Sequence, residues 1–141
     1  MTNLSSIQAS SFEAWSLNEW LDHLSGLHPK NIEMGLERVN KVFQQLNISF
    51  SKQSVVTVAG TNGKGTTCAF LEQACLAAGK KVGVYSSPHL IRYTERVRIN
   101  GIDGSEQAHC QAFQAVVRAR GDIPLTYFEF GTLAGLKLIH D

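Results

Sequence analysis

A glycine-rich segment at residues 60–67, with the sequence GTNGKGTT, is the feature that most limits how this chain can fold. It follows a compact apolar run at residues 55–59 and precedes a helical pattern that ends at Gly79. A buried strand that leads into a glycine-rich turn and a helix N-terminus is a common way to hold nucleotide phosphates. Glycine lets backbone N–H groups approach an anion, and the helix end carries partial positive charge. The pattern therefore predicts an ATP-binding loop; the alternative is a strand-to-helix turn that holds no ligand.

The side chains of this segment fit the same chemistry. Lys64 can neutralise charge on the β- and γ-phosphates during phosphoryl transfer, so we predict it as the catalytic residue. A lysine that only began a solvated helix would oppose the helix dipole. A hydroxyl group of Thr66 or Thr67 can meet a magnesium ion. The residues predicted to bind ATP are Gly60, Thr61, Asn62, Gly63, Lys64, Gly65, Thr66 and Thr67.

The spacing within the loop is unusual. A standard Walker loop has four residues between its first glycine and the Gly-Lys pair, but here Val58 stands at the position of that first glycine. Gly65 also separates the lysine from the hydroxyl residues. With this variant, the chain resembles the folylpolyglutamate synthase/dihydrofolate synthase branch of the Mur-ligase superfamily, rather than the cell-wall ligases. Further matching stretches are residues 34–39 (MGLERV), 85–90 (YSSPHL) with 92–96 (RYTER), and 125–130 (LTYFEF).

This resemblance implies an ATP-dependent ligase that forms an amide bond. A substrate carboxylate attacks the γ-phosphate to give an acyl phosphate and ADP, and the amino group of L-glutamate then displaces phosphate. The implied partners are ATP, dihydropteroate or a folate as acceptor, and L-glutamate, with Mg²⁺ as cofactor. Ser87 matches a serine that contributes to magnesium coordination. Two segments match contacts to the pteroate substrate: Glu33, Met34, Gly35 and Leu36, and Thr126, Tyr127, Phe128 and Glu129.

The residues alone leave simpler explanations open for these candidates. Ser87 also suits an ordinary turn before a proline, and residues 33–36 also suit the start of an amphipathic helix. Thr126 and Glu129 have the spacing of a capping box, and Phe128 could be a core aromatic. A basic cluster has two explanations, a solvated face or a site for a substrate carboxylate. Its members are Arg92, Arg96 and Arg98, the last two expected on one strand face.

The periodicity predicts an α/β fold, a mostly parallel sheet flanked by helices, and the resemblance implies the P-loop ATPase fold of the Mur-ligase central domain. Strands at residues 54–59 and 82–85 flank a helix at 64–78, which makes a βαβ unit with parallel strands. On that helix one buried stripe is expected, formed by Cys68, Leu71, Cys75 and Ala78.

We expect a single domain with three parts. Residues 1–12 are polar and expected to be disordered, residues 13–50 form a helical segment on the substrate side, and residues 54–141 form the P-loop core. Capping boxes at residues 16–19 and 126–129 predict two helix starts. The last helical pattern has no stop signal before Asp141, so the core is expected to be incomplete, and the chain an N-terminal fragment.

Composition excludes several other classes of function. The net charge is +1, from 13 basic and 12 acidic residues, which speaks against a nucleic-acid surface. No apolar stretch approaches the ~20 residues of a membrane span, and residues 1–6 lack the pattern of a secretory signal. Three cysteines show no metal-binding spacing. We therefore expect a cytoplasmic protein without membrane or nucleic-acid partners, and a monomer.

Three other functions remain open on the residues alone. A Mur-type cell-wall ligase is disfavoured by Gly65, whereas a nucleotide triphosphatase or kinase would release or transfer phosphate without an amine acceptor. A non-catalytic nucleotide-binding module is the third. Because the family's other magnesium ligands, a glutamate and a histidine, have no counterpart before Asp141, we expect this fragment alone to lack ligase activity.

Overall fold

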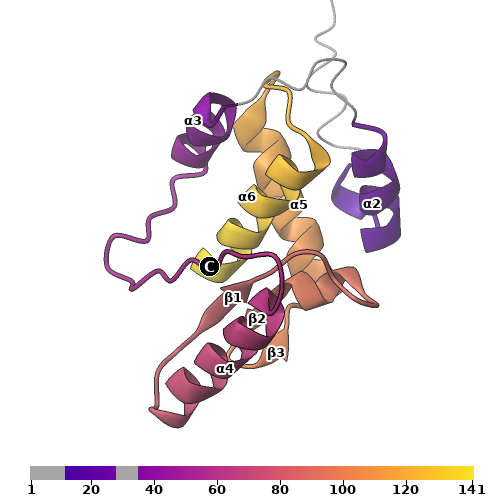
Figure 1. Ribbon diagram of the computed structural model, residues 1–141. Coiled ribbons are helices and arrows are strands. Elements are labelled where there is room, and N and C mark those ends of the chain that lie inside the picture. Colours follow the sequence, from indigo (N-terminus) through magenta and orange to yellow (C-terminus); the bar gives the residue numbers. More distant parts are fainter. Residues whose placement is uncertain (1–11, 28–34) are drawn as a thin grey trace, which may run out of the picture.

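The computed structural model describes residues 12–27 and 35–141 (Figure 1). The expectations for residues 1–11, Glu33 and Met34 lie outside these ranges. Helices predominate, and a small sheet lies between them. In chain order the elements are η1 (Phe12–Ala14), α2 (Leu17–Ser25), α3 (Glu37–Gln45), α4 (Lys64–Ala77), β1 (Gly83–Tyr85), η2 (Tyr93–Arg96), β2 (Val97–Ile99), β3 (Ile102–Asp103), α5 (Glu106–Arg120) and α6 (Tyr127–His140).

Side-chain caps define where these helices begin. At α2, the Ser16 hydroxyl accepts a hydrogen bond from the Glu19 amide at 3.3 Å, and the Glu19 carboxylate accepts one from the Ser16 amide at 2.7 Å. The start of α6 repeats this exchange, and at α5 the Ser105 hydroxyl accepts from the Ala108 amide at 3.1 Å. Each cap satisfies backbone N–H groups that a helix start leaves unpaired. The predicted capping boxes are confirmed.

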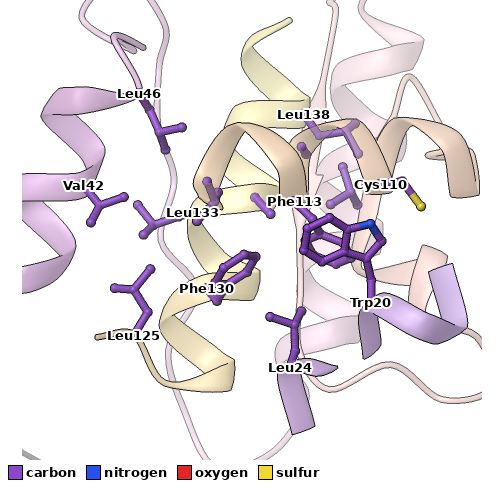
Figure 2. Packing of buried hydrophobic residues seen from close by; sticks show 14 of the residues in the cluster. Trp20, Leu24, Val42, Leu46, Cys110, Phe113, Leu125, Phe130, Leu133 and Leu138 are labelled. Atoms are coloured by element: carbon purple, nitrogen blue, oxygen red, sulfur yellow. The ribbon is translucent and has the colours of Figure 1, made fainter. Parts of the chain in front are cut away.

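The hydrophobic core lies among four helices. α5 and α6 pack against each other, and α2 and α3 lie to either side of this pair (Figure 1). Trp20 from α2 packs against Phe113 of α5, with ring centroids 5.5 Å apart, and Phe113 contacts Phe130 of α6 at 5.8 Å. From the other side, α3 brings the fully buried Val42 toward Leu133 (Figure 2). This cluster fixes the position of α6, whose first turn carries a predicted substrate segment.

Helix α6 also covers one face of the sheet, and glycine allows the close approach. A Cβ atom on Gly135 would lie 2.5 Å from Cδ2 of Tyr85 in β1. One turn earlier, a Cβ atom on Gly131 would lie 2.9 Å from the Tyr93 hydroxyl oxygen. Both distances are shorter than real contacts, so the tyrosine rings occupy the space that larger residues would need.

The sheet differs from the parallel one that we expected. It has the order β1-β2-β3, and both pairs are antiparallel. Residues 54–59 form no strand, and their backbone has no hydrogen bond to any described residue. A strand needs a neighbour that supplies its ladder of hydrogen bonds. β1 finds this neighbour in β2, which returns to it after a short loop, whereas the side chains of Val55 and Val56 stay 70% exposed. The α/β class is confirmed, but the predicted parallel pairing is absent from the described residues.

Helix α4 forms where predicted, but the prediction of its buried residues is wrong. Cys75 and Ala78 are exposed, and the buried residue of this helix is Glu72. Apolar side chains surround α4 on several sides, as the 73% exposed Phe70 shows, so periodicity alone could not identify the inward face. The helix faces the sheet instead through a charged pair, described below.

Candidate phosphate and substrate site

The segment 60–67 has the backbone geometry of an anion-binding loop. Gly63 is the N-cap of α4 and has a φ of 78°, in the left-handed region that favours glycine. The first amide of this segment that donates a helical bond is that of Thr67, to the Gly63 carbonyl at 2.9 Å. The amides of residues 61–66 have no acceptor among the described residues. Unpaired N–H groups at a helix start can bind an anion such as phosphate.

The Lys64 side chain folds back over this loop. Its Nζ atom donates to the Gly60 carbonyl at 2.6 Å and lies 3.4 Å from the Thr61 carbonyl. Both acceptors belong to the predicted ATP-binding segment, so the ammonium group is held at the loop. A phosphate could replace the two carbonyls as its partner without moving the helix. The arrangement fits the role predicted for Lys64.

Ser87 lies in the loop that follows β1 and is partly buried. The peptide bond between Ser87 and Pro88 is cis. Just before it, the Ser86 amide donates to the Arg96 carbonyl at 2.9 Å, which holds the start of the loop against η2. The loop therefore leaves the carboxyl end of β1 in a defined direction.

Glu95 holds the second half of this loop. Its carboxylate accepts hydrogen bonds from the amides of Arg92 at 2.8 Å, Leu90 at 2.9 Å and Ile91 at 3.2 Å. These bonds, from Arg92 first and then Leu90, lower the pKa of Glu95. The side chains of Leu90 and Ile91 nevertheless remain 92% and 86% exposed, so the loop is anchored through its backbone.

An ion pair links Arg38, just after the first predicted substrate segment, to Glu129 in the second. Glu129 completes the α6 cap, and it also accepts a hydrogen bond from Arg38 of α3 at 3.0 Å. Burial alone would raise the pKa of Glu129, but bonds from the Thr126 amide and Arg38 outweigh it, so the pKa is lowered. Because Arg38 lies two residues beyond Leu36, this pair brings the start of α3 to the start of α6. The side chains of Leu36 and Phe128 are 72% and 58% exposed.

The arginine cluster does not have the expected arrangement. Arg96 lies in η2 rather than in a strand, and it is 7% exposed, so it does not belong to a solvated face. Its Nε atom donates to Nδ1 of His89 at 3.0 Å, and its Cζ atom lies 4.9 Å and 5.6 Å from the ring centroids of Tyr93 and Tyr127. Sequence reasoning missed this burial because Arg96 was assigned to the face of a strand.

Arg98 points instead to helix α4. Its guanidinium group makes two contacts of 2.9 Å and 2.7 Å to one carboxylate oxygen of Glu72. The pair ties α4, and so the phosphate loop at its start, to β2. The sequence held one signal of this contact: Glu72 is the single acidic residue between Lys64 and Ala77. We overlooked that signal.

The donors available for a metal ion suit magnesium. Among the described residues, no group of three or more His, Cys, Asp and Glu side chains could hold a metal ion. The expected donors are hydroxyl groups, those of Ser87 and Thr66 or Thr67. Mg²⁺ prefers oxygen ligands, keeps several waters and is often held largely by substrate phosphates, so few protein ligands suffice. The residues present fit such an ion.

The sequence of this chain is similar to that of known enzymes. No family model matches the chain, and no described helix has the length and hydropathy of a membrane span. The chain is 57% identical over 122 residues to the dihydrofolate synthase/folylpolyglutamate synthase of Escherichia coli (strain K12), covering 86% of this chain and 29% of that protein.

Solved structures show the same relationship. The E. coli FolC structure in complex with DHPP and ADP superposes with a TM-score of 0.84 at 55% identity, covering 90% of this chain and 31% of that one. The bifunctional folylpolyglutamate synthase/dihydrofolate synthase of Yersinia pestis, complexed with AMPPNP and Mn ion, gives a TM-score of 0.86 over the same shares. The chain thus spans less than a third of the length of these relatives. Over the portion that it covers, it is related to the dihydrofolate synthase/folylpolyglutamate synthase family.

Proposed function

We propose that this chain supplies the phosphate-binding part of an ATP-dependent ligase that adds L-glutamate to dihydropteroate and to the γ-carboxyl group of folates. The observation that carries the proposal is the loop at the start of α4. Its amides at residues 61–66 have no acceptor among the described residues, and the Lys64 ammonium group lies against the same loop. The relatives support it, since the E. coli structure described above holds ADP and the Yersinia pestis structure holds AMPPNP.

The proposed reaction has two steps. An oxygen of the acceptor carboxylate attacks the γ-phosphorus atom of ATP, and the bond to the bridging oxygen of ADP breaks. The amino group of L-glutamate then attacks the carbonyl carbon of the acyl phosphate, phosphate leaves and the amine loses a proton. The phosphorylation is needed because a free carboxylate is a poor acyl donor.

The residues of this chain would act on the phosphates. Lys64 and the free amides would stabilise the negative charge of the β- and γ-phosphates as the first step proceeds. Mg²⁺, near the hydroxyl groups of Ser87 and Thr66 or Thr67, would supply further charge stabilisation. The exposed Phe128 and Leu36 would contact the pteroate. With donors for only part of a metal site, the chain alone is expected to lack ligase activity.

We further infer that residues 54–59 join the sheet as a strand parallel to β1 in the whole enzyme. Among the described residues β1 pairs only with β2, so its other edge can accept a neighbour. The exposed Val55 and Val56 would then be covered. The division into a substrate-side segment (13–50) and a P-loop core (54–141), the cytoplasmic location and the monomeric state stay predictions.

Calorimetry of the chain with Mg-ATP tests the proposal. We expect Lys64→Ala to weaken binding by roughly 10- to 100-fold, the usual effect of one hydrogen bond to a charged group. Lys80→Ala, an exposed lysine beyond the other end of α4, is the control and should leave affinity unchanged. Equal affinity of folded Lys64→Ala and wild type would contradict the proposal. Folate synthesis by the isolated chain, dependent on ATP and glutamate, would contradict its expected inactivity.

A further inference from the structure

Arg96 is a buried cation whose charge is not neutralised by any acidic residue in the described part of the chain. No Asp or Glu forms an ion pair with it among the described residues, although it is only 7% exposed. Nearby arginines behave differently. Arg38, Arg92 and Arg98 each lie within 4 Å of a carboxylate, those of Glu129, Asp103 and Glu72.

The groups that surround Arg96 pack against it but carry little negative charge. His89 accepts the Nε–H bond through Nδ1, which requires a neutral ring with its proton on Nε2. Burial raises the pKa of Tyr93 far above its ordinary value, so that phenol also stays neutral. The rings of Tyr93 and Tyr127 contribute only cation–π attraction. A buried charge without a counter-ion is costly, and an anionic ligand would remove that cost.

Arg96 also has hydrogen-bond donors left for a ligand. Of the five N–H groups of the Arg96 guanidinium, one donates a hydrogen bond to a described residue, His89. Neither terminal nitrogen donates a hydrogen bond to a described residue, and neither is among the fully buried side-chain atoms that lack a partner. Two parallel N–H groups can therefore meet a molecule that enters from outside.

The position of Arg96 connects the two parts of the candidate site. Its bond to His89 places it beside the loop that carries Ser87, the expected magnesium ligand. Its contact with Tyr127 places it at the first turn of α6, within the expected pteroate segment. The group that must lie between the metal-bound phosphate and the pteroate is the acceptor's carboxylate.

We propose that Arg96 binds the carboxylate of the acceptor, the group that ATP phosphorylates. The inference rests on the proposed function and adds a substrate-binding residue to it. A planar guanidinium matches a carboxylate with two parallel hydrogen bonds, and the flanking rings keep it in one plane. The phosphates of the nucleotide already have Lys64 and the free amides, whereas the described arginines Arg38, Arg92 and Arg98 are already paired with carboxylates of the chain.

Binding measurements with paired ligands test this role. Calorimetry would compare pteroate with its neutral carboxamide, and Mg-ADP separately, on wild type, Arg96→Gln, Arg96→Lys and Arg92→Gln. We expect wild type to prefer pteroate to the carboxamide. Arg96→Gln should weaken pteroate binding by roughly 10- to 100-fold and remove that preference, while carboxamide and Mg-ADP binding stay unchanged. Arg92, whose side chain is 72% exposed, provides the control: Arg92→Gln should leave the affinities for pteroate, the carboxamide and Mg-ADP unchanged.

Different results identify different failures. If wild type binds both pteroate ligands equally, or Arg96→Gln keeps the wild-type preference, the carboxylate role of Arg96 is wrong. If Arg96→Gln instead no longer binds Mg-ADP, the arginine contributes to nucleotide binding and the inference is overturned. Failure of wild type to bind any nucleotide contradicts the proposed function, while the pteroate comparison still tests Arg96. Should Arg96→Gln melt at a lower temperature than wild type, Arg96→Lys decides, because it keeps the charge and loses the planar fork.

Discussion

The ion pair between Glu72 and Arg98 should determine how firmly α4 is held. The Glu72 side chain is 3% exposed, and both Nε and Nη2 of Arg98 donate to its Oε2 atom. Another close approach of α4 to the sheet side is between Leu76 and Gly101, where an added Cβ atom would lie 3.4 Å from the leucine. We therefore predict that replacing either charged residue by methionine destabilises the fold and loosens the phosphate loop.

The two single substitutions should differ in size. Arg98→Met leaves a carboxylate buried without a partner, which costs about 3–5 kcal/mol of unfolding free energy. Glu72→Met leaves Arg98 without its partner, but the Arg98 side chain is 24% exposed and can turn toward water. We therefore expect this variant to lose about 2 kcal/mol of unfolding free energy. The double variant should lose less than the sum of both, with a coupling of about 2 kcal/mol.

Urea unfolding of the four proteins would measure these free energies as a double-mutant cycle. Calorimetry with Mg-ATP on the same four proteins would show whether the affinity of the phosphate loop for the nucleotide falls as well. Additive losses would mean that the pair contributes nothing beyond its separate members. A larger loss for Glu72→Met than for Arg98→Met would refute the reasoning from burial.

Three further predictions concern other parts of the molecule. Gly135→Ala should lower the unfolding free energy by about 2 kcal/mol in urea titrations, because overpacking of about 3 kcal/mol exceeds a gain of about 1 kcal/mol in helix propensity. Glu129→Gln should destabilise the chain at pH 7, where the lowered pKa of Glu129 contributes stability. That difference should shrink as pH falls below the ordinary value of 4.5, and a constant difference between pH 7 and pH 3 would exclude the Arg38 and capping bonds as its source. In the native state, a thiol reagent should label the exposed Cys75 fast and the buried Cys110 slowly; equal rates would contradict the burial.

The helix starts were predictable because their signals are local. A serine or threonine followed three residues later by glutamate satisfies its own backbone groups, whatever the rest of the chain does. The boxes at Ser16 and Thr126, and the end of α4 at Gly79 with its φ of 71°, all formed as expected. Such features depend on neighbours in sequence alone.

The sheet was predicted less well, since strand pairing depends on partners distant in the chain. Residues 54–59 have the composition of a buried strand, but β1 pairs with β2 instead. Charge pairing was only partly predictable: Glu72 is the single acidic residue between Lys64 and Ala77, but nothing in the spacing identifies Arg98, 26 residues away, as its partner. The burial of Arg96 likewise involves rings from η2, from α6 and from the loop after β1, which only the fold brings together.

The segment from Thr126 to Glu129 shows how the structure separates a cap from a binding role. The cap explains Thr126 and Glu129, and Tyr127 packs near Arg96, but Phe128 is 58% exposed and has no ring contact among the described residues. An exposed aromatic beside a rigid helix start can offer a flat wall to a pterin ring. Phe128→Ala should therefore leave the unfolding free energy within about 0.5 kcal/mol of wild type, as for other surface changes, yet weaken pteroate binding several-fold. Thr126→Ala is its counterpart and should lose about 1 kcal/mol of stability through the cap. If Phe128→Ala instead unfolds more easily and binds pteroate normally, the ring belongs to the packing of α6, and the pteroate must lie elsewhere.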